Sequence, residues 1–534
     1  MHGHNVIYLG LWSARLTLPG VPTRERGLLS SLTFSRTTPR TDLIPANMLR
    51  LVMDAYETLI LVYLLRGLPN SCLAISAALG NLATALSSNS SSSDHSGKGS
   101  IQSYIIRTEA LKMVSLLPTC NSEVDLAKYF SIYSKVQHLS RECADSDVNP
   151  DVTVLLCQGL HALSGAQLRD ASTLFHTAAQ QSLLYIDQVK HTTSMICYAW
   201  CSFISGERFP AGVDDIVEKI LHFAASTSNT ALHVWALELD IVLKSFANDF
   251  DGAEESLRLI RSLQRKGNPM DPVQRKENFS ATTSAIIAYS YLANMQFDRA
   301  SVHSIYACTK LAERKQGTVF GGLLLYLSSY AALGVVYGRM LNVKRTRSTD
   351  EIDSPERSFT RGRFYLQNHR RKVRDAPGNT MPRWRAGVLN SMRSVDRVSH
   401  GHVIQNRRLV DAARSAIECL SQLSFRFRAL APFLWILSSK LQRVSGSPTL
   451  STLADFDEKI RENVSSLRQF TFAESFIHLE RIALCTYLGV STDFERVGDS
   501  LKIAEDAFLK LGRCPIELSQ YINATATVEH TPDE

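Results

Sequence analysis

Apolar residues recur every three to four positions along most of this chain. The spacing in residues 101–114, and again in 124–136, is that of one face of an α-helix. Runs of strictly alternating apolar and polar residues, the pattern of a half-buried strand, do not occur in the sequence. Short connections rich in Gly, Asn, Asp or Pro separate the apolar stretches, for example Asn248-Asp249. We therefore predict an all-α protein.

Four segments share one arrangement of small and apolar residues, which indicates internal repetition. Their first positions lie 42, 40 and 47 residues apart, and each segment continues at i+4 and i+7. A small first residue lets the two helices of a hairpin pack closely, and the other two extend the same face toward the next hairpin. One hairpin cannot bury its apolar face alone, so we predict a stacked α-solenoid rather than unrelated amphipathic helices. The predicted repeat-packing residues are Gly165, Ala171, Phe175 and Ala178, then Val213, Val217 and Ile220, then Ala253, Leu257 and Ile260, and finally Ala300, Ser304 and Ala307.

The arrangement Ala171, Phe175 and Ala178 resembles the second helix of a tetratricopeptide repeat. With a period of roughly 40 residues, segments 160–182 and 243–267 also resemble the helical repeats that follow the ATPase domain in signalling proteins related to soluble adenylyl and guanylyl cyclases. In that family the repeats are C-terminal and non-catalytic. The resemblance implies a tetratricopeptide-like solenoid and, as an alternative function, the regulatory C-terminal part of a cyclase-like ATPase. The chain shows no cyclase or nucleotide-binding domain, so no catalytic residue carries over.

The distribution of apolar residues divides the chain into five parts. We expect a poorly ordered leader at 1–45, helical repeats at 46–341 and 405–515, and a frayed tail at 516–534. Between the two repeat regions, residues 342–404 have few apolar and many charged residues, which is typical of a disordered insert.

Residues 344–408 hold 16 Lys or Arg against 6 Asp or Glu, and therefore account for the net charge of +7 of the whole chain. A solvated loop is the favoured interpretation. A second is a regulatory segment, because Arg345 precedes Ser348 as basic-directed kinases require, and Pro355 follows Ser354. A third is contact with nucleic acid or anionic lipid. The candidate anion-contact residues are Arg370, Arg371, Lys372 and Arg374.

Residues 319–338 form a stretch of 20 residues without a charge, long enough to span a membrane. Gly334 and Gly338 form a G-x-x-x-G pair, a spacing used by packed membrane helices. Basic residues flank both ends, and the stretch lies where the next repeat helix is expected. We therefore predict a buried repeat helix and no integral membrane insertion.

The N-terminus and the cysteines bear on the compartment. Residues 1–50 contain six arginines and only two acidic residues, Glu25 and Asp42, which resembles a mitochondrial transit peptide. A poorly ordered leader or the cut end of a longer protein are the alternatives. The ten cysteines are scattered, and Cys197 and Cys201 have no partners at zinc-ligand spacing. This pattern predicts buried thiols in a reducing compartment, so we expect a cytoplasmic protein, with a mitochondrial one as the alternative.

The sequence lacks the common motifs of catalytic and nucleotide-binding sites. The segment Gly97-Lys98-Gly99-Ser100 lacks the upstream Gly and the Ser or Thr that a phosphate-binding loop requires directly after its Lys. G-x-S-x-G, H-E-x-x-H and dinucleotide-binding patterns do not occur. We therefore expect no catalytic, cofactor or metal site. The predicted function is a non-catalytic protein-interaction scaffold that binds a peptide or domain on its solenoid surface, rather than a nucleic-acid-binding protein.

Overall fold

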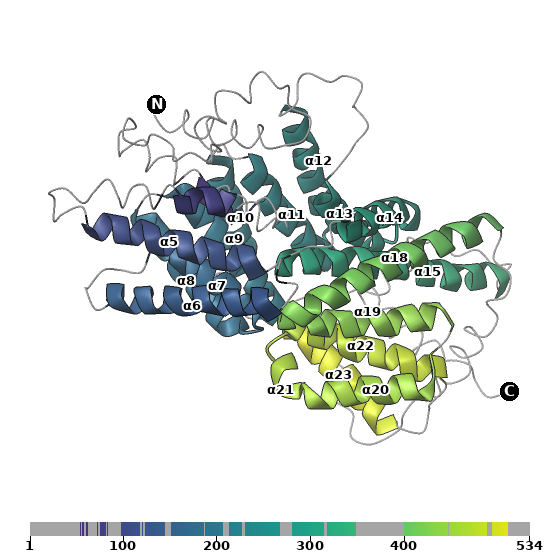
Figure 1. Ribbon diagram of the computed structural model, residues 1–534. Coiled ribbons are helices and arrows are strands. Elements are labelled where there is room, and N and C mark those ends of the chain that lie inside the picture. Colours follow the sequence, from purple (N-terminus) through teal and green to yellow (C-terminus); the bar gives the residue numbers. More distant parts are fainter. Residues whose placement is uncertain are drawn as a thin grey trace, which may run out of the picture.

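The computed structural model describes scattered positions between residues 54 and 83, and then 98–117, 120, 123–144, 151–185, 187–206, 213–226, 230–266, 280–313, 318–348, 400–446, 448–488 and 494–510. Within these residues the chain forms 17 α-helices and no strand, which confirms the all-α prediction for this part of the chain. The helices from α5 to α18 follow one another as hairpins (Figure 1). The pairs are α5 (Lys98–Leu116) with α6 (Glu123–Ala144), α7 (Val152–Ser164) with α8 (Leu168–Leu184), α9 (Gln188–Ser205) with α10 (Val213–Ser226), α11 (Thr230–Phe246) with α12 (Phe250–Lys266), α13 (Ala281–Ala293) with α14 (Phe297–Glu313), and α15 (Val319–Ser348) with α18 (His400–Arg426).

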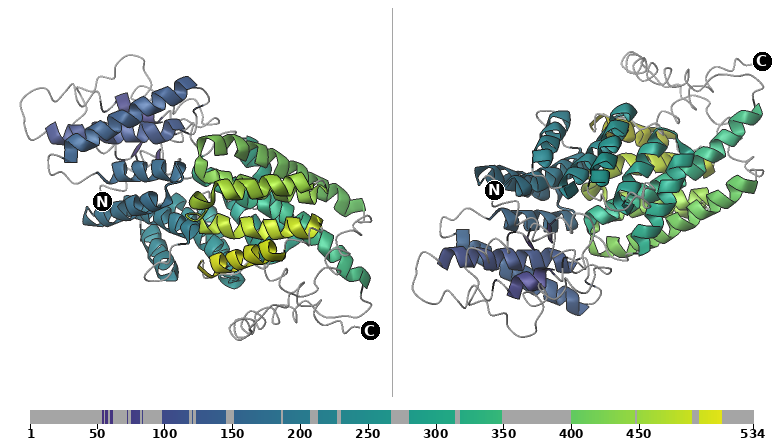
Figure 2. Two further views of the ribbon diagram at one scale, coloured as in Figure 1. Left: turned by 90° about the horizontal axis from the view of Figure 1, so that it is seen from below. Right: turned by 90° about the horizontal axis from the view of Figure 1, so that it is seen from above.

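A second group of helices follows α18. It consists of the 3-10 turn η4 (Arg428–Leu430), α19 (Ala431–Val444), α20 (Leu450–Glu462), the short α21 (Val464–Leu467), α22 (Thr471–Leu488) and α23 (Phe494–Lys510). Seen from below and from above, the earlier helices in purple and blue occupy one half of the molecule and the green and yellow helices the other (Figure 2). Helices extend into both ends of the predicted insert at 342–404. Helix α15 continues to Ser348, and α18 already begins at His400.

Local sequence fixes where several helices begin. The Asp151 carboxylate accepts a hydrogen bond from the Thr153 amide at the start of α7, and Ser280 accepts one from Thr283 at the start of α13. Thr449 and Thr452 exchange such bonds at the start of α20. These side chains satisfy amides that have no partner inside the helix, which makes each of these positions a specified helix start.

Three hairpins share one turn, in which a residue other than glycine adopts a left-handed backbone. The residues are Ala166, Asn248 and Met295, with φ of 68°, 61° and 56°. In each turn the left-handed residue donates its amide to the carbonyl three residues earlier, and the next residue donates to the carbonyl five residues earlier. This is the Schellman arrangement of a helix C-terminus. Its recurrence shows that hairpins α7–α8, α11–α12 and α13–α14 are built alike.

Gly165, one of the predicted repeat-packing residues, lies in the first of these turns. Gly165 has φ of −79°, which any residue adopts, and the left-handed residue is its neighbour Ala166. The hydrogen bonds that end α7 place the left-handed position one residue after Gly165, so the glycine is not needed there for its backbone freedom.

Replacing Ala166 by Gly is expected to stabilise the protein by about 1 kcal/mol, because it removes the left-handed strain at the cost of a single half-buried methyl group. The matched control is Ala127→Gly in the second turn of α6, where the helical backbone should make the same change destabilising by about 1 kcal/mol. Urea unfolding of the three proteins checks both signs. Destabilisation by Ala166→Gly would contradict the turn geometry.

The repeat-packing residues lie where the hairpins meet. Ala171, Ala253 and Ala300 are each the fourth residue of the second helix of their hairpin, and all three are buried. Phe175 packs on α7 where that helix has Gly159, whose added Cβ would lie 2.6 Å from the Phe175 ring. The other members that the structure describes, buried in the same interfaces, are Ala178, Val217, Ile220, Leu257, Ile260, Ser304 and Ala307.

The second set has a different register from the one we predicted. Val213 is the first residue of α10, so the residue at the fourth position is Ile216, which is buried. The sequence pattern does not reveal this because Val217 and Ile220 belong to the buried face in either alignment. Val213 therefore does not correspond to Ala171, and the repeat intervals are less even than the sequence indicates.

Helix α15 is the core helix of the molecule. It is the one helix among the described residues that is long and apolar enough to cross a membrane, and 94% of that stretch is buried inside the protein. An added Cβ on Gly334 would lie 2.6 Å from Leu292, and one on Gly338 would lie 2.5 Å from Phe297. The G-x-x-x-G pair therefore serves close packing against α13 and α14, in agreement with the predicted buried helix.

The helices do not leave an open arc, because α22 returns to α9 and α11. The Thr471 hydroxyl donates to the Ser205 carbonyl at 2.5 Å. The ring of Phe472 lies 5.1 Å from that of Phe203 and 5.6 Å from that of Phe246. Aromatic rings thus fill the inner side of the molecule where α22 meets α9 and α11.

Candidate functional site

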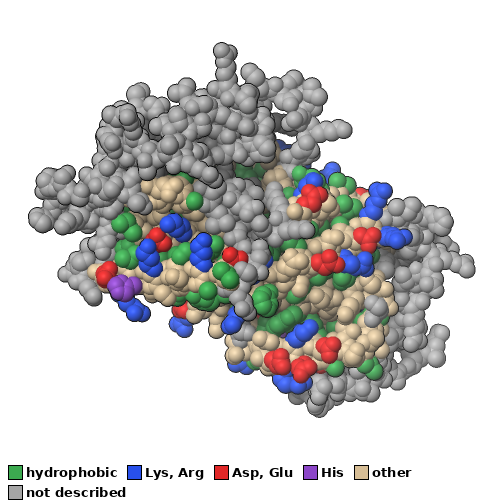
Figure 3. Space-filling model, in the orientation of Figure 1, with side chains coloured by type: hydrophobic (Ala, Val, Ile, Leu, Met, Phe, Trp, Pro, Cys, Tyr) green, Lys and Arg blue, Asp and Glu red, His purple; other side chains and the backbone are tan. Residues whose placement is uncertain are grey.

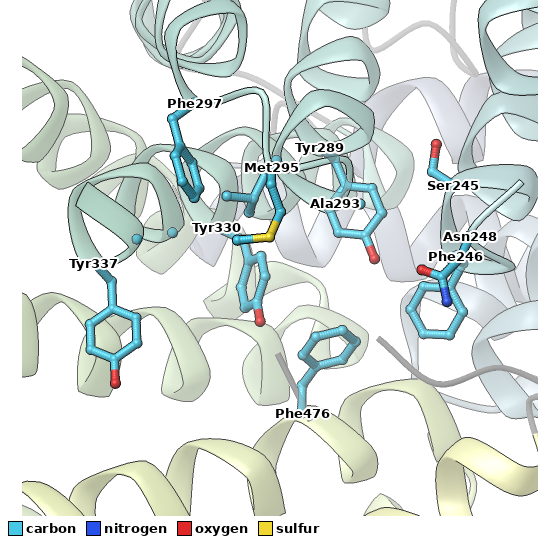
Figure 4. Close-up of a pocket in the computed structure, with 13 residues that line it drawn as sticks. Ser245, Phe246, Asn248, Tyr289, Ala293, Met295, Phe297, Tyr330, Tyr337 and Phe476 are labelled. Carbon is cyan, nitrogen blue, oxygen red and sulfur yellow. The ribbon is translucent and has the colours of Figure 1, made fainter. Parts of the chain in front are cut away.

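A pocket remains on this inner side, between the end of α11, α13, α15 and α22. It has a cavity volume of about 50 Å³ and is walled mainly by aromatic rings (Figure 4). Its principal lining residues are Phe246, Tyr289, Met295, Phe297, Tyr330 and Phe476. One water occupies at least about 10–15 Å³ of such volume, so the pocket has room for a side chain of a few heavy atoms. Its apolar walls favour an apolar group over a charged one.

Two buried cations stand behind the tyrosines of this pocket and do not line it. The Lys440 ammonium lies 3.5 Å from the ring centroid of Tyr330, and the Arg443 guanidinium lies 4.4 Å from that of Tyr337. Arg443 also donates to both carboxylate oxygens of Glu480, at 3.0 and 2.9 Å. The cation–π contacts fix the rings of Tyr330 and Tyr337, and the hydrogen bonds to Glu480 fix Arg443. The wall of the pocket is therefore preorganised.

Two of the left-handed turn residues lie on the same pocket. Asn248 ends hairpin α11–α12 at its turn, and Met295 occupies the equivalent position in α13–α14. A left-handed backbone at a residue with a side chain costs roughly 1–2 kcal/mol. Strained positions of this kind cluster at functional sites. The two turns therefore bring a polar and a flexible apolar side chain to the lining of one pocket.

The densest cluster of charges lies elsewhere, between α5, α7 and α9. The Lys190 ammonium lies 3.2 Å from the Glu57 carboxylate, and Arg107 lies 3.6 Å from it. Arg107 also pairs with Asp151 at 2.5 Å. Burial raises the pKa of Glu57, and the two cations oppose that shift. Since each charge in this set faces an opposite one, the cluster holds helices together and is not our candidate site.

Two of the described histidines, His161 and His478, make contacts between helices. His161 accepts or donates a hydrogen bond with the Tyr129 hydroxyl, and burial lowers its pKa. In α22, burial together with nearby Arg481 lowers the pKa of His478 to about 4. Its Nδ1 lies 3.3 Å from the Ser500 hydroxyl of α23.

The low pKa of His478 predicts a pH dependence of stability. In the unfolded chain this imidazole takes up a proton near pH 6.5, and in the folded protein only near pH 4. The unfolded state therefore binds more protons between these values, so the contribution of His478 is present above pH 6.5 and is lost as the pH falls toward 4. We expect a loss of about 3 kcal/mol across this window. His478→Gln should abolish that part of the pH dependence in urea unfolding, whereas the exposed His138→Gln should leave it unchanged. Equal profiles for all three proteins would contradict the burial of His478.

Only one of the predicted phosphorylation and anion-contact residues lies among the residues that the structure describes. Ser348 is the last residue of α15. Ser354 and the anion-contact candidates Arg370, Arg371, Lys372 and Arg374 lie outside the described residues. Among the described residues, no group of three or more His, Cys, Asp or Glu side chains is placed to hold a metal ion. The aromatic pocket could not be predicted from the sequence, because its rings come from helices far apart in the chain.

Comparisons with known proteins add no relationship. No family model, no curated protein and no solved structure matches this chain. The resemblance to tetratricopeptide and cyclase-related repeats therefore stays a prediction from the sequence.

Proposed function

We propose that this protein is a non-catalytic interaction scaffold, built as a tetratricopeptide-like α-solenoid, which holds a segment of a partner protein in the aromatic pocket. The observation that carries the proposal is the pocket between successive hairpins, with the equivalent turn residues Asn248 and Met295 on its lining. The shared turns of three hairpins support the repeat architecture.

The chemistry of the pocket suits a protein partner. Tyrosine, phenylalanine and methionine supply a large contact area, and aromatic residues and Met are enriched in the cores of protein interfaces. Because the rings are fixed from behind by Lys440 and Arg443, a partner side chain would enter a site that is already formed. The pocket is small, so we propose that it receives the apolar anchor residue of a peptide rather than a whole domain surface.

The charge distribution agrees with a protein partner. Basic and acidic side chains are interspersed over the described surface in the view of Figure 3, with apolar side chains between them. A protein that binds nucleic acid through its body would show a one-sided basic face. The buried thiols of the eight described cysteines support a reducing compartment, so we propose the cytoplasm.

Filling the pocket tests the proposal. Ala293 lines it from α13, and Ala293→Phe places a ring in the space that the partner's anchor would occupy. The matched control is Ala127→Phe, the same change on the exposed side of α6. Tagged proteins of equal helicity and melting temperature are used to recover partners from cells, and the proteins recovered are quantified by mass spectrometry.

We expect the wild type and Ala127→Phe to recover the same proteins in equal amounts. Ala293→Phe should recover at least about tenfold less of one or more of these proteins. Equal recovery by all three would exclude the pocket as the binding site. Turnover of ATP or formation of a cyclic nucleotide by the purified chain, abolished by substitution of one of its residues, would contradict the non-catalytic assignment.

A further inference from the structure

The size of the aromatic pocket limits the side chains that it can hold. An engineered cavity of about 150 Å³ in another protein binds one benzene ring. The aromatic pocket has a volume of only about 50 Å³, and large rings form most of its wall (Figure 4). The phenyl or indole ring of a partner therefore does not fit, whereas the end of an aliphatic side chain does.

The wall of the pocket cannot easily move back to admit a larger group. The ring centroid of Phe476 lies 5.2 Å from that of Tyr330 and 6.1 Å from that of Phe246. There is no spare room between α13 and α15 at this point, because an added Cβ on Gly334 would lie 2.6 Å from Leu292. Closely packed groups resist displacement, so the pocket should select its ligand strictly by size.

Aromatic rings can also form cages for cationic groups, but the charges around this pocket oppose a cation. The face of an aromatic ring attracts an ammonium or guanidinium group. The Lys440 ammonium already lies 3.5 Å from the ring centroid of Tyr330. The Arg443 guanidinium lies 4.4 Å from that of Tyr337. None of the described residues on the lining is acidic, so a further cation would have no carboxylate there to balance its charge.

The burial of the two cations strengthens this opposition. Lys440 is 2% exposed and Arg443 is 4% exposed, so water screens their charges only weakly. Arg443 is paired with Glu480, whose carboxylate accepts hydrogen bonds from it at 3.0 and 2.9 Å. A cationic side chain in the pocket would meet the charge of Lys440 across the ring of Tyr330, whereas an uncharged side chain would not be repelled.

We propose that the partner's anchor in this pocket is an uncharged aliphatic side chain, that of leucine or methionine, and that the pocket excludes aromatic and cationic side chains. The inference rests on the proposed function and specifies its partner. A side chain of about four heavy atoms matches the volume, because one water-sized group takes about 10–15 Å³ of it. Its carbon atoms gain dispersion contacts with the surrounding rings, and the sulfur of a methionine adds sulfur–aromatic contacts.

NMR of the full chain, with carbon-13 in its methionine methyl groups, tests this selection. Met295 lines the pocket and serves as the reporter, and its signal is assigned by its loss in Met295→Leu. The probes are the N-acetyl methylamides of leucine, methionine, phenylalanine, ε-trimethyl-lysine and alanine. Ala293→Phe fills the pocket, and Ala127→Phe on the exposed side of α6 is its matched control.

We expect the leucine and methionine derivatives to shift the Met295 signal on saturable binding. Their dissociation constants should be at least about tenfold lower than those of the phenylalanine and trimethyl-lysine derivatives. The alanine derivative should leave the signal unchanged. The shifts should be absent in Ala293→Phe and retained in Ala127→Phe.

Removal of the charge behind Tyr330 tests the exclusion of cations by itself. Lys440→Met keeps the length of the side chain and leaves the ring face without an ammonium group. It should tighten binding of the trimethyl-lysine derivative at least about fivefold and leave binding of the leucine derivative unchanged. Lys459→Met, at an exposed lysine of α20, is the control and should affect neither.

Binding of the phenylalanine or trimethyl-lysine derivative as tight as that of the leucine derivative would overturn the inference. A Met295 signal that no probe shifts would overturn it as well, and an unchanged trimethyl-lysine affinity in Lys440→Met would overturn the exclusion by charge. The proposed function is judged separately, by the recovery of partners with Ala293→Phe. It stands if that recovery falls while the pocket accepts an aromatic or cationic probe.

Discussion

Phe472→Ala is expected to destabilise the protein by about 4 kcal/mol. The side chain is 3% exposed at the start of α22. Its ring centroid lies 5.0 Å from that of Phe476, 6.0 Å from that of Phe433 and 6.2 Å from that of Tyr326, in addition to the rings of α9 and α11. Truncation leaves a cavity at the point where α22 meets the earlier helices, and those rigid rings cannot collapse to fill it.

Urea unfolding, followed by circular dichroism, measures this loss. Phe425→Ala is the control, because that ring on α18 is 88% exposed and its removal should change stability by less than about 0.5 kcal/mol. A small effect of Phe472→Ala, equal to that of the control, would show that α22 does not pack against α9 and α11 in solution.

Glu480→Ala is expected to cost about 3–5 kcal/mol, because it leaves the guanidinium of Arg443 buried without its counter-charge. Arg443 and Glu480 are each 4% exposed, and the Ser439 hydroxyl adds a third hydrogen bond to the carboxylate at 3.2 Å. Removal of the carboxylate also frees Arg443 to shift from the ring of Tyr337, so the aromatic pocket should lose part of its wall.

A double-mutant cycle separates the pair from its surroundings. Arg443→Met combined with Glu480→Leu removes both charges and should recover most of the stability lost in either single variant. Glu313→Ala, which breaks the exposed pair with Lys310, should cost less than about 1 kcal/mol. Additive losses in the cycle would contradict a buried, directly paired Arg443 and Glu480.

The sequence predicts the helices well where the apolar pattern is strong and local. The hairpin of Ala171 and Phe175 is found as expected, since small and aromatic residues at these positions leave few ways for two helices to meet. The register of α10 was predicted wrongly, because Ile216, Val217 and Ile220 are all apolar and give two alignments of the same face. The position of the left-handed residue at Ala166 depends on where α7 ends, which glycine content alone does not reveal.

The aromatic pocket could not be predicted from the sequence for a different reason. Its rings belong to Phe246, Tyr289, Tyr330 and Phe476, which come together only because α22 returns across α11 and α15. In the sequence, each of these aromatic residues has the spacing of an ordinary core residue of a helix. No local pattern indicates that α22 packs back against α11 and α15. The ion pair of Arg443 and Glu480 could not be predicted from the sequence either, because 37 residues separate the two.

Hydrogen exchange of the chain with and without a partner recovered by the wild type tests the central claim most directly. The amides of the turns at 247–249 and 294–296 donate to backbone carbonyls, but the turns lie at exposed or half-buried helix ends, so they should exchange through local opening in the free protein. If a partner segment occupies the pocket between them, both turns and the neighbouring part of α15 become protected, while the exposed face of α6 is unchanged. Protection confined to α6 or other outer helices, with both turns unaffected, would contradict a partner-binding pocket at this site.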